Sequence, residues 1–148
     1  MRISAKGRYA LASMIDLAVH YNNNENITVL SISERLDISK IYLEQVFALL
    51  KRGGLVISIK GSQGGYKLNK NPMDITMFDI LESIEVGMFE EIKEVVGEKS
   101  HAIDDALQIA VFGPLDSAIK DTLIGITLEA LLKEVEKQSG DNQFMFYI

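Results

Sequence analysis

The most constraining feature of the sequence is a helical pattern followed at once by a glycine-rich hairpin, over residues 38–66. Ser39 predicts the start of the helix, because its hydroxyl can accept a hydrogen bond from a free amide of the first turn. Gly53 and Gly54 predict its end, because glycine enters the left-handed conformation at little cost. The residues that we expect to form its buried stripe are Ile41, Leu43, Val46, Phe47, Leu49 and Leu50.

The predicted hairpin has two short strands around a glycine-rich tip. Residues 55–59 are apolar at alternate positions, as in a half-buried strand, and residues 66–68 return after the tip at 61–65. A preceding helix over 29–36, with Ser31 as cap and Glu34 completing a capping box, and a turn at Asp37 complete a helix-turn-helix. The sequence therefore predicts a mostly α protein with a small β-hairpin, namely a winged helix-turn-helix plus a long dimerisation helix.

The charge of the chain is divided unevenly along its 148 residues, which carry a net charge of −6. Residues 1–71 hold ten Lys and Arg against five Asp and Glu, whereas residues 72–148 hold five against sixteen. Such asymmetry favours a basic nucleic-acid-binding module on an acidic one, although chance clustering of surface charge gives the same totals. The absence of cysteine excludes disulfides and thiolate metal sites. Without a signal-peptide core or a membrane-length apolar run, a soluble cytoplasmic protein with no membrane contact is expected.

Polar side chains at three places are candidates for contact with double-stranded DNA. Those near the start of a first helix over 4–21 would contact phosphates, those at the start of the helix after Ser39 would face the major groove, and those at the hairpin tip would lie beside it. Solvated helix ends, a core role for Tyr42 and an inert turn remain alternatives. The predicted DNA-binding residues are Arg2, Ser4, Lys6, Ser39, Lys40, Tyr42, Gln45, Lys60, Ser62 and Gln63.

The acidic half predicts a second functional region. A helix capped by Thr76 and Asp79 should end a DNA-binding domain over 1–86, and an acidic connecting segment follows over 87–112. A long helix over 113–138, with Pro114 in its first turn, carries an apolar stripe that favours pairing with a second copy, although it could instead fold back on its own domain. The predicted dimerisation residues are Leu115, Ile119, Leu123, Ile126 and Ala130.

The last ten residues, 139–148, form a tail with an apolar end. The chain finishes F-M-F-Y-I, and such side chains are costly to leave in water. Phe146, Tyr147 and Ile148 are therefore candidates for binding a partner, by a mode in which a C-terminal carboxylate is captured together with an apolar anchor. Packing within the dimer is the alternative.

No arrangement of residues predicts an enzyme. Serines and acids are common, but no set of nucleophile, base and orienting residue can be assigned around the two histidines from spacing. The glycines at 61–65 precede a strand, whereas a phosphate-binding loop precedes a helix. His101 with Asp104 and Asp105 is a weak set of metal ligands without cysteines, so no metal site or cofactor is expected.

Three motifs carry a family resemblance: M-R-I-S-A-K-G-R-Y-A-L at the start, Y-L-E-Q at 42–45 and K-G-S-Q-G-G-Y at 60–66. The chain resembles the small winged-helix repressors that include the iron–sulfur regulator IscR and the nitric-oxide-sensing repressor NsrR. The resemblance implies a DNA-binding repressor. Relatives with an iron–sulfur cluster carry three cysteines before the long helix, and this chain has none, so a cluster is not expected. Lys60 stands where relatives often have arginine, and it keeps the charge but loses the planar fork.

Within that family the chain looks most like the cysteine-metabolism (CymR-type) repressors of Gram-positive bacteria, which also lack cluster cysteines and end M-F-Y-I. This resemblance implies a homodimeric repressor of cysteine and sulfur metabolism genes that binds O-acetylserine thiol-lyase (cysteine synthase). Ile148 would occupy the enzyme's active site, and O-acetylserine would compete with it. A direct small-molecule sensor, and an interaction module that acts only through its tail, remain alternatives.

Overall fold

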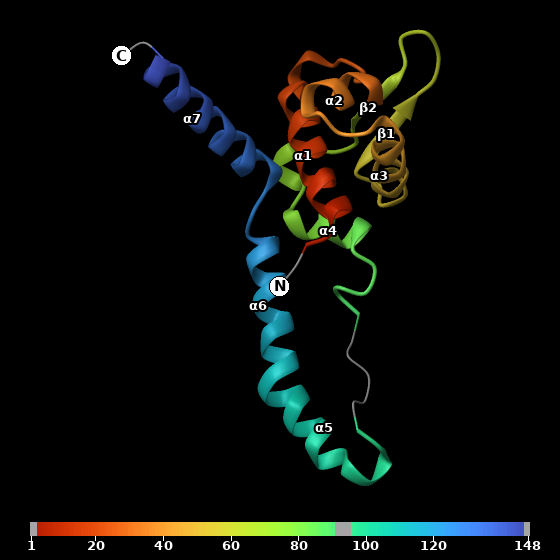
Figure 1. Cartoon of the computed structure of the whole chain (residues 1–148), viewed down its shortest axis with the longest axis vertical. Coiled ribbons are helices and arrows are strands. Elements are labelled where there is room, and N and C mark those ends of the chain that lie inside the picture. The colour runs from red at the N-terminus through yellow and green to blue at the C-terminus, as the bar shows by residue number, and fades with distance from the viewer. Residues whose placement is uncertain (1–2, 91–95, 147–148) are drawn as a thin grey trace.

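Residues 5–84 form the predicted winged helix-turn-helix, and residues 101–124 project from it (Figure 1). The computed structural model describes residues 3–90 and 96–146, with side chains as far as 140. The first unit comprises α1 (Ala5–Val19), η1 (Tyr21–Asn23), α2 (Val29–Leu36), α3 (Lys40–Arg52), β1 (Val56–Ile59), β2 (Gly65–Leu68), η2 (Pro72–Asp74) and α4 (Met77–Ile84). Beyond it lie η3 (Glu98–Ser100), α5 (His101–Leu107), the π-helix η4 (Gln108–Phe112), α6 (Gly113–Ile124) and α7 (Leu128–Phe146).

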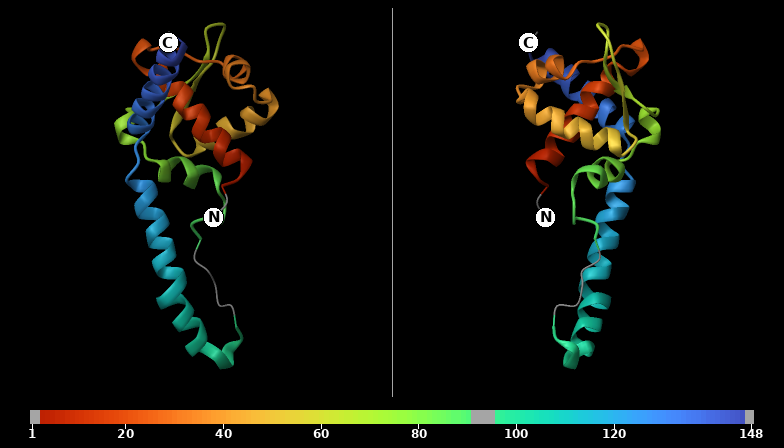
Figure 2. Two further views of the ribbon diagram at one scale, coloured as in Figure 1. Left: turned by 60° about the vertical axis from the view of Figure 1, so that its left-hand side comes forward. Right: turned by 90° about the vertical axis from the view of Figure 1, so that its right-hand side faces the viewer.

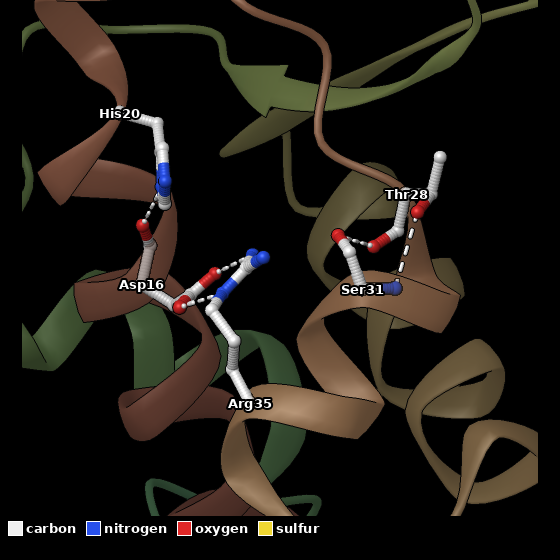
Figure 3. A network of polar contacts seen from close by, with 5 residues as sticks. All are labelled: Asp16, His20, Thr28, Ser31 and Arg35. Atoms are coloured by element: carbon white, nitrogen blue, oxygen red, sulfur yellow. Dashed lines mark hydrogen bonds and ion pairs between the residues drawn. The ribbon is translucent and has the colours of Figure 1, made fainter.

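Side-chain caps fix where most of these helices begin. Ser39 accepts from the Tyr42 N–H, and Thr76 and Asp79 form the predicted capping box of α4. The predicted bounds of α2 are confirmed, but its predicted cap, Ser31, was wrong, because the cap is Thr28, whose hydroxyl accepts from the Ser31 N–H at 3.1 Å. The Ser31 hydroxyl instead donates to the Thr28 carbonyl at 2.8 Å (Figure 3). Both residues are cap formers, and only the backbone conformation decides between them.

The core of the winged helix lies between α1, α3 and α4. On α3 the completely buried side chains are Leu43, Val46, Phe47 and Leu50, and Leu49 is half-buried. Ile41 was wrongly assigned to this stripe, because its side chain is 72% exposed. Two residues along a helix correspond to a rotation of about 200°, so Ile41 lies on the side away from Leu43.

The helices α1 and α2 are joined by an ion pair on the surface of this core. Arg35 donates from Nε and Nη2 to the two carboxylate oxygens of Asp16, at 2.9 and 2.7 Å (Figure 3). The hydrogen bond to Asp16 raises the pKa of Arg35 above its ordinary value. The pair joins the two helices and fixes how α2 lies on α1.

The wing is attached to the helix-turn-helix by its returning strand. β1 and β2 pair antiparallel from Val56 with Leu68 to Ile59 with Gly65, and Tyr66 also pairs with Ile27 just before α2. Gly65 has φ +151°, and a Cβ there would lie 2.7 Å from the Ile27 carbonyl oxygen. Only glycine fits this close approach, which ties the hairpin to the segment that leads into α2.

The single helix predicted over 113–138 is two helices. α6 ends at Ile124, and residues 125–127 run back along the start of α4 before α7 begins. The Met77 N–H donates to the Ile126 carbonyl at 2.9 Å, and the Leu128 N–H donates to the Ile75 carbonyl at 2.8 Å. Leu128 is completely buried. These bonds between distant segments replace the helical bonds that would continue α6, so α7 packs on α1 and η2.

The elements α5, η4 and α6 form one continuous rod that extends away from the core (Figures 1 and 2). At its π-helical turn the Gly113 N–H donates to the carbonyl of Gln108, five residues earlier. Pro114 follows, and a proline in a regular helix lacks one N–H and crowds the carbonyl four residues back. A wider turn relieves that crowding. Residues 101–112, predicted as part of an acidic connection, are thus mostly helical.

Candidate nucleic-acid interface

The start of α3 presents a continuous polar surface to solvent. Ser39, Lys40, Glu44 and Gln45 are all exposed, and Lys40 Nζ lies 3.8 Å from Glu44 Oε1. The Ser39 hydroxyl accepts from the Tyr42 N–H at 3.5 Å, a long bond that leaves its own proton free to donate. The structure therefore brings three of the predicted major-groove residues together at the exposed N-terminal end of one helix, with Ile41 among them.

Tyr42 joins this surface to the core. Its side chain is half-buried and packs against the core cluster, with its ring edge-on to Tyr9 at a centroid distance of 5.2 Å. Lys6 Nζ lies 6.0 Å from the Tyr42 ring centroid, at the outer range of a cation–π contact. Tyr42 therefore has at least the structural role that the sequence left open. Its contact with Lys6 places the Lys6 ammonium beside the start of α3.

Ser4 has a structural role that its sequence position did not reveal. Its hydroxyl accepts from the Gly7 N–H at 3.0 Å and donates to Glu85 Oε1 at 2.7 Å, while its own N–H donates to the same oxygen at 2.9 Å. Glu85 is the residue that ends α4. These bonds fix the start of α1 to the end of α4, so a phosphate contact by Ser4 remains a prediction. Arg2 lies outside the described residues.

The wing tip carries the third group of predicted residues. Lys60, Ser62 and Gln63 are exposed there, and the Gln63 carbonyl accepts from Asn26 Nδ2 at 3.0 Å. A polar groove runs between the tip and the start of α2. The side chains of the tip are donors in solvent, held in place by the backbone pairing of Tyr66 with Ile27. They lie on a separate element from α3, as contacts beside the major groove require.

The residues predicted for dimerisation fall into two groups. Leu115 is exposed on the rod and Ile119 is half-buried there, whereas Leu123 and Ile126 pack against the core of their own chain. Ala130 is exposed on α7. The alternative, folding back on the chain's own domain, is therefore correct for Leu123 and Ile126. Sequence reasoning missed three exposed apolar residues that precede Leu115 along the rod: Ile103, Ile109 and Val111.

The predicted end of the helix at residue 138 was wrong, because α7 continues to Phe146 and the described part of the predicted tail is therefore helical. Phe146 is the last residue of that helix, but its side chain lies beyond the described ones, and Tyr147 and Ile148 lie outside the described residues altogether. In the part of α7 whose side chains are described, every residue from Lys133 to Gly140 is exposed. The helix thus carries the chain away from the core before the predicted partner-binding residues begin.

The chain does not supply the donors for an iron–sulfur cluster held by thiolates. It contains no cysteine, and among the described residues no three His, Asp or Glu side chains gather as a metal site would require. In the same part of the chain no helix is long and apolar enough to span a membrane.

Comparisons with known proteins agree with this geometry. Residues 3–134 match the model of the Rrf2 family, described as iron-dependent transcriptional regulators. The transcriptional regulator IscR of Pectobacterium atrosepticum is 35% identical over 137 residues, which cover 92% of this chain and 82% of that protein. The structure of CymR, the global cysteine regulator of B. subtilis, is 34% identical with a TM-score of 0.74 and covers 90% of this chain and 98% of its own. The IscR structure from T. potens gives 33% identity and a TM-score of 0.69, with coverage of 93% and 90%.

Proposed function

The chain belongs to the Rrf2 family of winged-helix transcriptional regulators, and we propose that it is the member of this family that represses cysteine and sulfur metabolism genes. It is a DNA-binding repressor rather than an enzyme, in line with relatives that are named as regulators of transcription. The observation that carries the finer proposal is the likeness to the global cysteine regulator over 98% of that chain. The absence of cysteine supports a repressor without an iron–sulfur cluster, and the ending M-F-Y-I supports the resemblance to the cysteine-metabolism repressors.

A homodimer is part of the proposal, and its contact surface is the rod. Five large apolar side chains along it are between 46% and 77% exposed, namely Ile103, Ile109, Val111, Leu115 and Ile124. Isolated exposed apolar residues are ordinary, but five along one projecting helix, on more than one of its sides, favour burial of the rod against a second copy. A two-fold dimer would also present two α3 helices. Helix-turn-helix proteins bind the paired half-sites of double-stranded DNA with two such helices. The proposal places this binding in the cytoplasm.

The proposed partner is O-acetylserine thiol-lyase, bound through the tail. The exposed second half of α7 supports this, because it leads the chain, as far as Phe146, away from the core and from the rod (Figure 1). The enzyme would then act as corepressor, and O-acetylserine would release it by competing for the same active site. No metal or cofactor of the repressor itself takes part in this proposal.

One titration tests the partner. The full-length protein is added to O-acetylserine thiol-lyase while the fluorescence of the enzyme's pyridoxal phosphate is followed, and a variant that lacks only Ile148 serves as control. We expect a saturable change with the full chain, no change with the variant, and reversal by O-acetylserine. An equal response from both proteins, or from neither, would contradict the proposed partner while leaving DNA binding intact.

A second candidate is a direct small-molecule sensor, which rests on one cavity. A pocket of about 300 Å³ lies between residues 87–90 and the rod, and Phe112, Leu115 and Lys120 contribute to its lining. Calorimetry of the isolated protein with O-acetylserine and with cysteine distinguishes the two candidates. Heat of binding without the enzyme would favour the sensor, and none would favour the enzyme as relay.

DNA binding itself is tested by its dependence on salt. Each phosphate neutralised by a basic side chain lowers the slope of log affinity against log salt by about 0.9. We expect a steep slope and a preference for one sequence over a random duplex. A flat response without sequence preference would favour the remaining alternative, a module that acts only through its tail.

A further inference from the structure

Ile41 is the most exposed large apolar side chain in the helix-turn-helix. It is 72% exposed, at the second position of α3, and it belongs neither to the buried core nor to the side chains packed against it. The other large apolar side chains of α3 are buried or half-buried. Burial of an isoleucine side chain is favourable by about 1.5–3 kcal/mol. Its position in water is therefore unexplained by the fold of the single chain.

The neighbours of Ile41 indicate what covers it. Gln45 lies four residues on, on the same side of the helix, and both Ser39 and Lys40 are exposed beside it. These side chains suit the edges and phosphates of DNA, and their polarity is unsuited to the core of a protein interface. Ile41 is also a single exposed apolar residue among polar ones, whereas the rod carries several exposed apolar side chains, which suits the proposed contact of two chains.

We propose that Ile41 contacts the C5 methyl group of a thymine in the major groove, next to the base pair whose adenine is contacted by Gln45. This proposal rests on the proposed mode of DNA binding through α3. The thymine methyl is the apolar group that the major groove displays, whereas the other edges present hydrogen-bond donors and acceptors. A β-branched side chain loses little conformational freedom when it is buried, which suits a fixed apolar contact.

The chemistry makes Ile41 a determinant of specificity. It can neither donate nor accept a hydrogen bond, so it gains nothing from a cytosine or a guanine at the same position. A thymine there buries the methyl group and part of the isoleucine together. Removal of one methyl group from such a contact should weaken binding about three- to fivefold, from the free energy of burying one methylene-sized group.

The test separates the methyl group from the rest of the base. A preferred duplex is first selected from a random pool with the full-length protein. Each thymine of one half-site is then replaced by deoxyuridine, which keeps the Watson–Crick pairing and lacks only the methyl group. Affinities of the wild type and of Ile41→Ala are measured on every duplex. The matched control is Val86→Ala, which removes a side chain that is 92% exposed on the segment after α4.

We expect the wild type and the Val86→Ala control to lose three- to fivefold in affinity at one deoxyuridine position per half-site. Ile41→Ala should bind the thymine duplex three- to tenfold more weakly and should not distinguish it from the deoxyuridine duplex. Because alanine is a better helix former than isoleucine and the site is exposed, the variant should fold like the wild type. Its circular dichroism and melting temperature check this.

Different outcomes of this experiment would contradict the inference and the proposed function. Sequence-selective, salt-dependent binding with no methyl preference at any thymine would overturn the inference alone. The same conclusion follows if Ile41→Ala keeps the wild-type methyl preference. If no duplex is selected and binding does not depend on salt, DNA binding through α3 is wrong and the inference is wrong with it.

Discussion

The winged helix buries many of its apolar side chains, whereas the rod leaves several large apolar side chains exposed. Among the described residues, every buried hydrophobic side chain except Leu128 lies between Ala10 and Ile84, inside the winged helix. The rod has none, although it carries Ile103, Ile109, Val111 and Leu115 exposed. The first region is thus completed by its own chain. The second exposes its apolar side chains, as the proposed contact with a second copy requires.

This difference separates stability from assembly. Side chains of the winged helix should govern the free energy of unfolding of the monomer, because their contacts form within one chain. Side chains of the rod should leave that quantity nearly unchanged and should govern the association of two chains instead. Leu123, Ile126 and Leu128 mark the boundary, since they lie just beyond the exposed part of the rod and pack on the winged helix.

The largest effect is expected in the core of the winged helix. Phe47 is completely buried, and its ring lies 4.7 Å from that of Tyr66, so Phe47→Ala leaves a cavity between α3 and the wing. We expect a loss of about 3–5 kcal/mol in the free energy of unfolding, measured with urea. The matched variant Ile109→Ala, at a side chain that is 77% exposed, should change it by less than about 0.5 kcal/mol under monomeric conditions. Equal losses would contradict the comparison.

The second-largest effect is expected on dimerisation and DNA affinity, from a substitution on the rod. Leu115→Glu places a charge in the proposed contact of two chains, so sedimentation should find a mass near the 16.5 kDa of one chain rather than twice that. DNA affinity should fall by about 100-fold, because two linked binding units gain at least that factor from binding together. Val135→Glu, on the exposed part of α7, is the control and should leave mass and affinity unchanged. A Leu115→Glu protein that remains dimeric would place the interface elsewhere.

The winged helix could be predicted from sequence because its signals are local. Ser39, Thr76 and Asp79 cap their helices as expected, and Asp37 ends α2 in the left-handed conformation, at φ 53°. Buried stripes at helical spacing place the core. Even the exposure of Ile41 could have been found, because a position two residues from Leu43 and four from Gln45 falls on the side of Gln45.

The break between α6 and α7 could not be predicted in this way. Leu123, Ile126 and Ala130 continue the helical spacing through Gly125, and one glycine in a helix costs only about 1 kcal/mol. The break is stabilised by bonds from Ile126 and Leu128 to the segment at 75–77, which no local pattern encodes. The same holds for the bonds of Ser4 with Glu85, 81 residues apart in the chain. Candidate site residues with such distant partners were the ones whose structural roles were missed.

A smaller loss of stability should follow from removing the ion pair between α1 and α2. Arg35→Met removes a bidentate pair whose Asp16 side chain is only 10% exposed, while that of Arg35 is 40% exposed and partly screened by solvent. We expect a loss of about 1 kcal/mol in the free energy of unfolding, reduced at high salt. Lys40→Met, which removes an exposed pair at 3.8 Å on α3, should cost less than about 0.5 kcal/mol.

The pH dependence of the Arg35 contribution follows from the direction of its pKa. A base whose pKa is raised by folding contributes stability below its unfolded pKa and loses it as pH rises through the folded one. Arginine is already fully protonated across the neutral range and folding raises the pKa of Arg35 further, so its contribution should be constant between pH 6 and 9. A difference between wild type and Arg35→Met that varies across this range would show that the effect comes from another group.

The smallest effect distinguishes two neighbouring hydroxyls at the start of α2. Thr28→Ala removes the acceptor for the Ser31 N–H and should lower the free energy of unfolding by about 1 kcal/mol. Ser31→Ala removes only a donor to the Thr28 carbonyl, which water can replace at this exposed helix end, so its loss should be below about 0.5 kcal/mol. Urea unfolding of both variants measures the difference. A larger loss for Ser31→Ala would restore Ser31 as the cap and shift the start of α2 by one turn, away from its link to the wing through Ile27.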